Sequence, residues 1–206
     1  MRPMTISPLT PLLLAAALAG APPVGRAASP VAPAASAAEA GAPLFQFAGK
    51  PFVHRWSHAG QHEFTPLAQP DLARWQDMVT VQLFDKVSND DELALVANGV
   101  LVAYQKAGQV LRANTVRATA ERPAEHLVVA LLHDKGVREM VFARFRLAPG
   151  GGGQALVYSH RVYGTEPDDA AGAWFRANDI PTEQAMMAWT DIPSAAALRA
   201  LPQSPS

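Results

Sequence analysis

The sequence predicts an α+β domain in which an antiparallel sheet of about six to seven strands is flanked by helices on both faces. The order of its segments is a hairpin, a strand, a long helix, four consecutive strands and then short helices. This order differs from the alternating β-α-β series of doubly wound nucleotide-binding folds. Residues 127–132 are apolar at every position, which is typical of a strand buried on both faces. An α/β/α sandwich accounts for both observations.

Seven segments alternate polar and apolar residues or are rich in β-branched and aromatic residues, as strands are. The first two flank Ala59-Gly60 and are expected to pair as a hairpin. The last two flank the glycine-rich residues 148–153 and are expected to form a second hairpin. In chain order the strand segments are 51–57, 61–66, 77–84, 110–117, 125–133, 137–147 and 154–163.

The clearest helix is expected after Ser88, which suits an N-cap, because acidic residues follow at the positive helix end. Apolar residues then recur with helical spacing over three turns, and Gly108 suits the C-terminus. Pro181 and Pro193 are expected to divide the last helices. The other helical segments are 70–76 (one or two turns), 168–177, 182–190 and 194–201.

The N-terminal region is typical of an export signal, with Arg2 followed by an apolar run over residues 9–21. This run is shorter than the roughly 20 residues of a spanning helix, although an uncleaved anchor is the alternative. Small residues at 17–19 and 35–37 offer two cleavage positions. The expected domains are a signal peptide (1–21), an Ala/Pro-rich disordered linker or leader remnant (22–43), a globular domain (44–201) and a tail (202–206).

The composition excludes several kinds of chemistry. The 206 residues include no cysteine, so disulfides, thiolate zinc sites and thiol catalysis are excluded. A formal net charge of −1 offers no electrostatic basis for binding nucleic acid. The sequence has no Gly-x-Ser-x-Gly or Ser-x-x-Lys motif, and the glycine run 150–153 lacks the Lys-Ser/Thr of a P-loop. We therefore expect no cofactor.

Four stretches resemble those of a family of exported bacterial proteins of uncharacterised function. They are HRWSHAGQHEFTP (54–66), WQDMVT (75–80), PAEHLVVALL (123–132) and YSHRVYG (158–164). This resemblance carries no catalytic residues. The element order also resembles the α/β/α sandwich of PsbP and Mog1. Proteins with that architecture are mostly binding or assembly modules, so the resemblance implies a bias away from enzymes.

His54, His58 and His62 are spaced four residues apart, and Glu63 follows the last. Imidazoles are common zinc ligands, and on a helix this spacing would align three of them. The segment alternates like a strand, however, and the hairpin then places His58 opposite Gln61. In that hairpin His54 and His58 share one face and His62 points to the other. We expect exposed imidazoles, with a metal site as the alternative.

Two similar tripeptides suggest a binding surface. Each contains His-Arg and lies beside an aromatic residue, which gives the candidate binding residues Arg55, Trp56, His160, Arg161 and Tyr163. Arginine binds carboxylate or phosphate, and aromatic side chains add contact area at low entropic cost. The alternative is that these side chains face solvent or pair with local carboxylates.

Other arginines suggest a basic stripe along one strand. Arg144 and Arg146 fall on one face, to which Arg138 can be added. Either this stripe is solvated, or acidic residues of a helix such as Asp168 and Asp169 cover it. The tryptophans are expected to pack in the core or under helices.

Together these observations predict an exported cell-envelope protein, periplasmic or secreted, that is a binding or assembly module rather than an enzyme. Its partner would be an envelope protein or a small ligand, and we expect neither nucleic acid nor, after signal cleavage, an integral membrane segment. The alternative is a metal-dependent hydrolase in which His54, His58 or His62 holds the metal and Glu63 is the general base.

Overall fold

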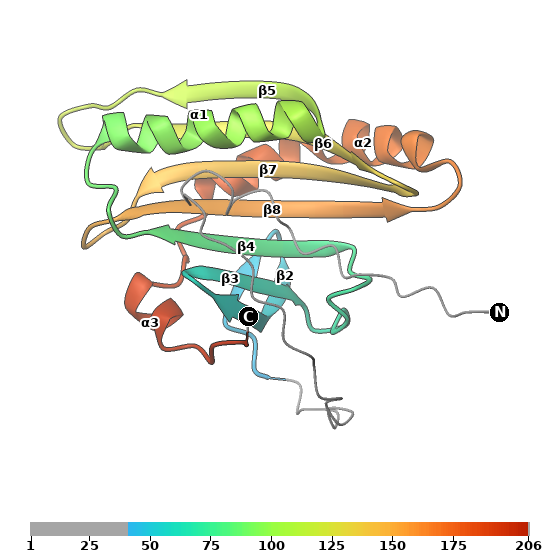
Figure 1. Cartoon of the computed structure of the whole chain (residues 1–206), viewed down its shortest axis with the longest axis horizontal. Coiled ribbons are helices and arrows are strands. Elements are labelled where there is room, and N and C mark those ends of the chain that lie inside the picture. Colours follow the sequence, from blue (N-terminus) through green and yellow to red (C-terminus); the bar gives the residue numbers. More distant parts are fainter. Residues whose placement is uncertain (1–40, 206) are drawn as a thin grey trace, which may run out of the picture.

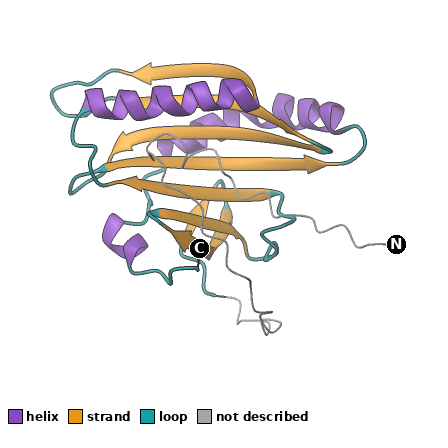
Figure 2. Ribbon diagram, viewed as in Figure 1, coloured by secondary structure: helices purple, strands orange, loops and turns teal. Residues whose placement is uncertain are grey.

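An eight-stranded antiparallel sheet forms the centre of the computed structural model, which describes residues 41–205 (Figures 1 and 2). The spatial order is β1-β2-β3-β4-β8-β7-β6-β5, so the first four strands and the last four each form a meander. The expected signal peptide (1–21) and residues 22–40 of the expected linker lie outside the described residues. The strands are β1 (Phe45–Phe47), β2 (Lys50–His58), β3 (Gln61–Pro66), β4 (Asp77–Phe84), β5 (Gly108–Val116), β6 (Glu125–Asp134), β7 (Val137–Leu147) and β8 (Gly153–Tyr163).

The predicted α+β class with an antiparallel sheet is confirmed, and each of the seven predicted strands is present. The predicted number of six to seven strands is too low. The missing strand is β1, whose three residues pair with the start of β2. A segment this short has too few residues for an alternation to be recognised.

The β2–β3 hairpin closes through Ala59 and Gly60, which have positive φ values of 49° and 80°. Two consecutive residues in this region are typical of the two-residue turns that match the twist of paired strands. The predicted register is confirmed, because His58 lies opposite Gln61. The pairing then shifts by one residue at Arg55, where β2 contains a bulge.

Helix α1 (Asp90–Ala107) lies where the sequence predicts it, but Asn89 rather than Ser88 is its N-cap. The Asn89 side chain accepts a hydrogen bond from the backbone of Glu92. The Glu92 carboxylate in turn accepts from the backbone and hydroxyl of Ser88. The acidic first turn therefore forms a reciprocal capping arrangement that begins one residue later than expected.

Two helix predictions are wrong. Residues 70–76 form turns rather than helix, and the segments on either side of Pro181 form one continuous helix, α2 (Pro167–Ala188). A proline inside a helix removes one backbone hydrogen bond. The helix nevertheless continues, because Phe175 before the proline and Met186 after it pack in the same core. The last helix is α3 (Ala195–Arg199).

Alternate residues of β6, β7 and β8 enter two separate cores. Phe142 of β7 lies in a core to which α2 contributes Met186, whereas its neighbour Ala143 lies in a core to which α1 contributes Leu93 and Val100. We call these the α2 core and the α1 core. Figure 1 shows α1 running across the β5–β6 end of the sheet. Within the described residues, no helix is both long enough and apolar enough to cross a bilayer.

Candidate functional site

The four residues proposed as metal ligands do not converge. His54 and His62 lie on the α2-core face of the sheet, whereas His58 and Glu63 lie on the opposite face. The expectation that His54 and His58 share a face is wrong, because the bulge at Arg55 reverses the direction of the side chains before it. Between residues 41 and 205, no group of three or more His, Asp or Glu side chains is arranged to hold a metal ion.

A hydrogen-bonded chain joins two of these imidazoles through a serine. The Ser57 Oγ lies 2.7 Å from His54 Nε2 and 2.7 Å from His62 Nδ1. The expected exposure is found for His58, but only 1 % of His62 and none of Ser57 is exposed. A serine between two imidazoles resembles an activated nucleophile, yet this hydroxyl is closed to a substrate in the structure.

Arg161 and Tyr163 of β8 belong to a cluster at one end of the sheet. The Arg161 guanidinium lies 4.0 Å from the centroid of the Trp75 ring, and its Nε donates to Glu139 at 2.7 Å. The Tyr163 hydroxyl donates to the Trp75 carbonyl at 2.6 Å. The Arg74 guanidinium lies over the Tyr163 ring at 5.8 Å. We call these five residues the Arg161 cluster.

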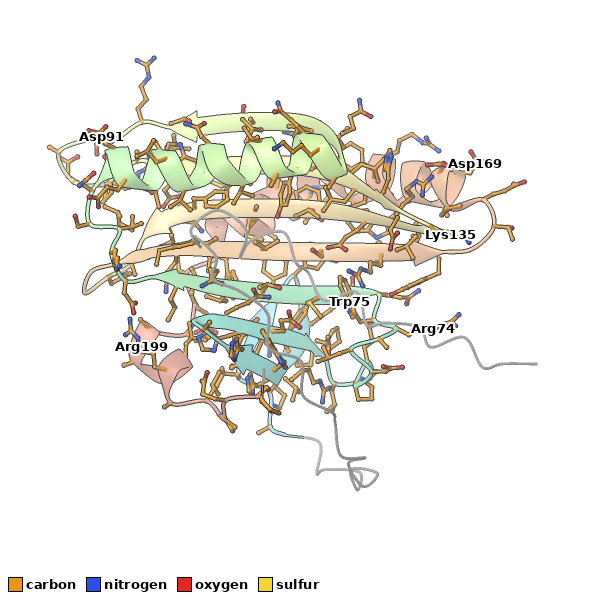
Figure 3. The ribbon with its side chains drawn as sticks, viewed as in Figure 1. Arg74, Trp75, Asp91, Lys135, Asp169 and Arg199 are labelled. Atoms are coloured by element: carbon orange, nitrogen blue, oxygen red, sulfur yellow. The ribbon has the colours of Figure 1, made fainter. Side chains whose placement is uncertain are left out.

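The Arg161 cluster alternates cations and aromatic rings, and its cations differ in accessibility. Arg161 is 8 % exposed, and its carboxylate partner and the Trp75 ring fix its position. Arg74 is exposed, and Tyr163 is half-buried. Figure 3 shows Arg74 and Trp75 at the same end of the sheet as Lys135. The cluster therefore has a rigid base, in which Arg161 is held against Trp75, and an accessible part formed by Arg74 and the Tyr163 ring.

The structure separates His160 from the other predicted binding residues. His160 and Arg161 are neighbours on β8 and so point to opposite faces. The His160 ring stacks on Trp174 of α2, with ring centroids 4.2 Å apart and an interplanar angle of 7°. His160 is thus part of the contact between the sheet and α2.

Arg55 and Trp56 lie on β2. Arg55 donates to the Thr65 hydroxyl at 2.9 Å and to the carbonyls at the end of β3, so its guanidinium fastens the bulge to the next strand. The half-buried Trp56 ring lies 5.9 Å from the ring of His58. Arg55 therefore bonds a local hydroxyl and two main-chain carbonyls, and not the carboxylates that the alternative named.

Asp77 at the start of β4 accepts hydrogen bonds from four side chains. Oδ1 accepts from Tyr158 at 2.7 Å and from His160 Nδ1 at 2.9 Å. Oδ2 accepts from Lys50 at 2.7 Å and from Gln69 at 3.3 Å. Burial by itself would raise the pKa of Asp77, but hydrogen bonds from His160, Lys50 and Tyr158 and the Lys50 charge outweigh it and hold the pKa well below its ordinary range.

Glu63 on β3 is also a buried carboxyl group, but its pKa is shifted in the opposite direction to that of Asp77. Only 3 % of the residue is exposed, and burial raises its pKa to about 7. A hydrogen bond from Gln61 at 2.8 Å and the charge of Arg161 oppose this shift, while the charge of Glu139 adds to it. Glu63 is therefore a proton-exchanging group near neutral pH, but one without access to solvent.

The arginines of β7 do not form a solvated stripe. Arg138 makes two hydrogen bonds to Asp168 of α2, at 2.6 and 2.9 Å, as the covered alternative predicted. Arg144 is buried and makes two hydrogen bonds of 2.9 Å to Glu125. It also donates to two main-chain carbonyls at the end of α2. These arginines join α2 to the sheet.

The sequence reasoning missed Arg74, Trp75, Glu139 and Asp77 as members of these clusters. Glu139 lies directly opposite Arg161 in the β7–β8 pairing, and Asp77 lies opposite His160 in the β4–β8 pairing. The Glu139–Arg161 pair could have been predicted from the β7–β8 hairpin, because the register of a hairpin follows once its turn is known. The second pair joins strands far apart in the chain, which no local pattern indicates.

Comparison with known proteins gives a likeness of fold. No protein-family model matches the sequence, and no curated protein is significantly similar to it. The structure is similar to the crystal structure of the Saccharomyces cerevisiae Ran-binding protein Mog1p, with a TM-score of 0.42 and 10 % sequence identity. The match covers 66 % of this chain and 81 % of that protein. Mog1 is one of the two sandwich proteins whose element order this sequence resembles.

Proposed function

We propose that this protein is an exported cell-envelope protein that works as a binding or assembly module, and that the Arg161 cluster contacts a carboxylate-bearing segment of a partner protein. The observation that carries the proposal is the exposed guanidinium of Arg74 over the Tyr163 ring, beside a base in which Arg161 is held between Trp75 and Glu139. Groups that are already held in place lose little freedom when a partner binds. Arginine, tryptophan and tyrosine are also the residues that dominate binding energy at protein interfaces.

The charges of the cluster favour an acidic partner. Arg161 is already paired with Glu139, so the cation left for a partner is the exposed Arg74, which lies over the Tyr163 ring. A carboxylate beside Arg74 would gain charge-assisted hydrogen bonds, while an apolar neighbour could rest on Tyr163. The other candidate binding residues, Arg55 and Trp56, lie on β2 and are not members of the Arg161 cluster.

The groups able to exchange protons favour binding over catalysis. A general acid or base needs a pKa near the working pH and contact with the substrate. Asp77 remains ionised and is occupied by four donors, and Glu63 titrates near pH 7 but is buried. Ser57 is held between His54 and His62 and has no exposed surface. Each group therefore lacks one of the two requirements.

Export rests on the N-terminal sequence, in which Arg2 precedes the apolar run 9–21. The test is to express the full chain in a Gram-negative host, separate periplasm from cytoplasm and measure the mass of the mature protein. Loss of the first residues together with recovery in the periplasm would support export. Full-length protein in the cytoplasm would contradict it.

Partner binding can be tested with fluorescently labelled decapeptides that are rich in Glu and Asp, in Lys, or in neutral residues. We expect the acidic set to bind best and to weaken at high salt, because exposed charges are screened. Arg74→Ala should weaken the acidic set by roughly tenfold, the loss of about 1.4 kcal/mol. Arg117→Ala, which removes an exposed arginine at the end of β5, is the matched control. Equal effects of the two variants would refute the assignment.

A further inference from the structure

The end of the chain, residues 194–205, is fastened across the outer part of β2 and β3. We call it the C-terminal strap. Leu198 of α3 is completely buried in the α2 core, and Arg199, which is labelled in Figure 3, pairs with Asp85 at 2.5 Å. Beyond α3, Ser204 donates its backbone N–H to the Ser57 carbonyl at 2.7 Å and accepts from the Ser57 N–H through its hydroxyl at 3.3 Å.

Ser57 therefore connects the strap to the imidazole chain. Its backbone groups bind Ser204, while its hydroxyl contacts His54 and His62. On the outer edge of β2, the short strand β1 pairs only as far as Phe52. The bond to Ser204 thus occupies a part of the edge that β1 leaves open. An open edge with free backbone groups is a place where another strand can add.

Within the described part of the chain, the hydrogen bonds of the imidazole chain leave one ring nitrogen of His62 without a partner. The Ser57 hydroxyl has one proton, so it donates to one imidazole and accepts from the other. The Nε2 atom of His62 is buried without a hydrogen-bond partner in the described residues. Protonation of His62 would place a charged N–H donor at this position with nothing to receive it, which is costly in a buried site.

The charged groups around His62 add to this cost. Burial lowers the pKa of His62, and the nearby His54 of β2 and Arg199 of α3 lower it further. Burial also lowers the pKa of His54. The charge of Arg55 acts in the same direction, whereas a hydrogen bond from the imidazole to the Trp56 backbone opposes the shift. The exposed Arg199–Asp85 ion pair is itself part of the strap attachment, but it contributes little to that attachment because water screens exposed charges.

We propose that the C-terminal strap is an acid-released cover, which leaves the sheet when His62 binds a proton and uncovers the β2 edge at Ser57. Release lets the imidazoles of His62 and His54 regain water, so the released state binds protons more readily. The docked state is therefore favoured above the ordinary histidine pKa of about 6.5. Below it, the ratio of released to docked strap rises roughly tenfold for each pH unit and each proton, until the docked-state pKa is reached.

The experiment follows His62 and the strap together in the wild-type protein between pH 8 and pH 4.5. Imidazole carbon shifts report protonation of each histidine, and hydrogen-exchange protection factors report attachment of residues 194–205. We expect strap protection to fall at least tenfold at the pH where His62 titrates, while β6–β8 stay protected. His62→Gln should retain strap protection at low pH. His58→Gln, which changes an exposed histidine of the same hairpin, should behave like wild type.

Several outcomes would overturn the proposal. The proposal is wrong if the strap of His62→Gln still loses protection at low pH, or if the pH of release matches the titration of a histidine other than His62. It is also wrong if the strap and the sheet lose protection in one step. If His62→Gln fails to fold, the wild-type comparison of His62 protonation with strap protection decides alone. A strap that stays protected after His62 has become charged would also refute it.

Discussion

Asp77→Asn is the sharpest test of how the sheet, the N-terminal hairpin and α2 are held together. The substitution preserves shape but replaces one carboxylate oxygen by an NH₂ group. Oδ1 and Oδ2 each accept from two donors. In either orientation of the amide, its NH₂ group therefore faces two hydrogen-bond donors and no acceptor. If the NH₂ takes the Oδ1 position, the hydroxyl of Tyr158, a residue only 5 % exposed, loses its acceptor.

The expected loss of stability is about 3–5 kcal/mol. A buried polar group left without a partner costs about 1–3 kcal/mol, and breaking a buried charged pair costs about 3–5 kcal/mol. The Lys50 contribution is at the low end, since the lysine side chain is 49 % exposed and its charge can be solvated. For a domain of this size the loss corresponds to a fall in melting temperature of roughly 10 °C.

Urea unfolding followed by circular dichroism measures this loss, with the slope m checked for constancy. The matched control is Asp168→Asn, which makes the same change in the exposed ion pair with Arg138. The control should alter stability little, because solvated ion pairs contribute little. A loss below about 1 kcal/mol for Asp77→Asn, or an equal loss in both variants, would refute the view of Asp77 as a saturated acceptor.

The same variant should change the acid limb of the stability curve. The folded-state pKa of Asp77 lies below the ordinary value, so the folded protein binds fewer protons at this group than the unfolded chain. The stabilisation it provides is fully present above about pH 4 and is lost as the pH falls toward the folded-state pKa. Between about pH 4 and pH 2, Asp77→Asn should therefore lose stability less steeply than wild type.

Three further changes test other parts of the structure. Arg144→Met should cost about 3–5 kcal/mol in thermal melts, because its largely buried carboxylate partner and two carbonyls at the end of α2 lose their donor. Arg144→Lys, which keeps the charge, should recover part of that loss. Glu63→Gln should stabilise the protein at pH 8 relative to pH 5, since the wild-type contribution is present below about pH 4.5 and is lost as the pH rises through about 7. An equal change in urea midpoint at both pH values would contradict this. Gly108→Ala should destabilise by about 3 kcal/mol, because its Cβ would lie 2.1 Å from the Leu131 carbonyl oxygen. The helical control Gly172→Ala should instead stabilise by about 0.5–1 kcal/mol.

Most of the fold could be predicted from local patterns because its strands and longest helix are long enough to show them. The β7–β8 hairpin lies within a residue of its predicted bounds, since strands and a glycine-rich turn leave separate signals. The helix errors have a different cause. Local rules predict that a helix ends at Pro181, but the helix continues because residues on both sides of the proline pack into the α2 core. Tertiary contacts of this kind are absent from a local pattern.

The candidate sites could be predicted far less well, because they depend on which face each side chain occupies. Side chains alternate along a strand, so a single inserted residue reverses every direction beyond it. The bulge at Arg55 does this to His54, which joins His62 and Ser57 instead of His58. Histidine spacing alone therefore suggested metal binding, whereas the bulge produces a buried hydrogen-bonded chain beneath the end of the polypeptide. The bulge at Arg55 thus separates His54 from His58 and also creates the chain from which we infer acid release of the strap.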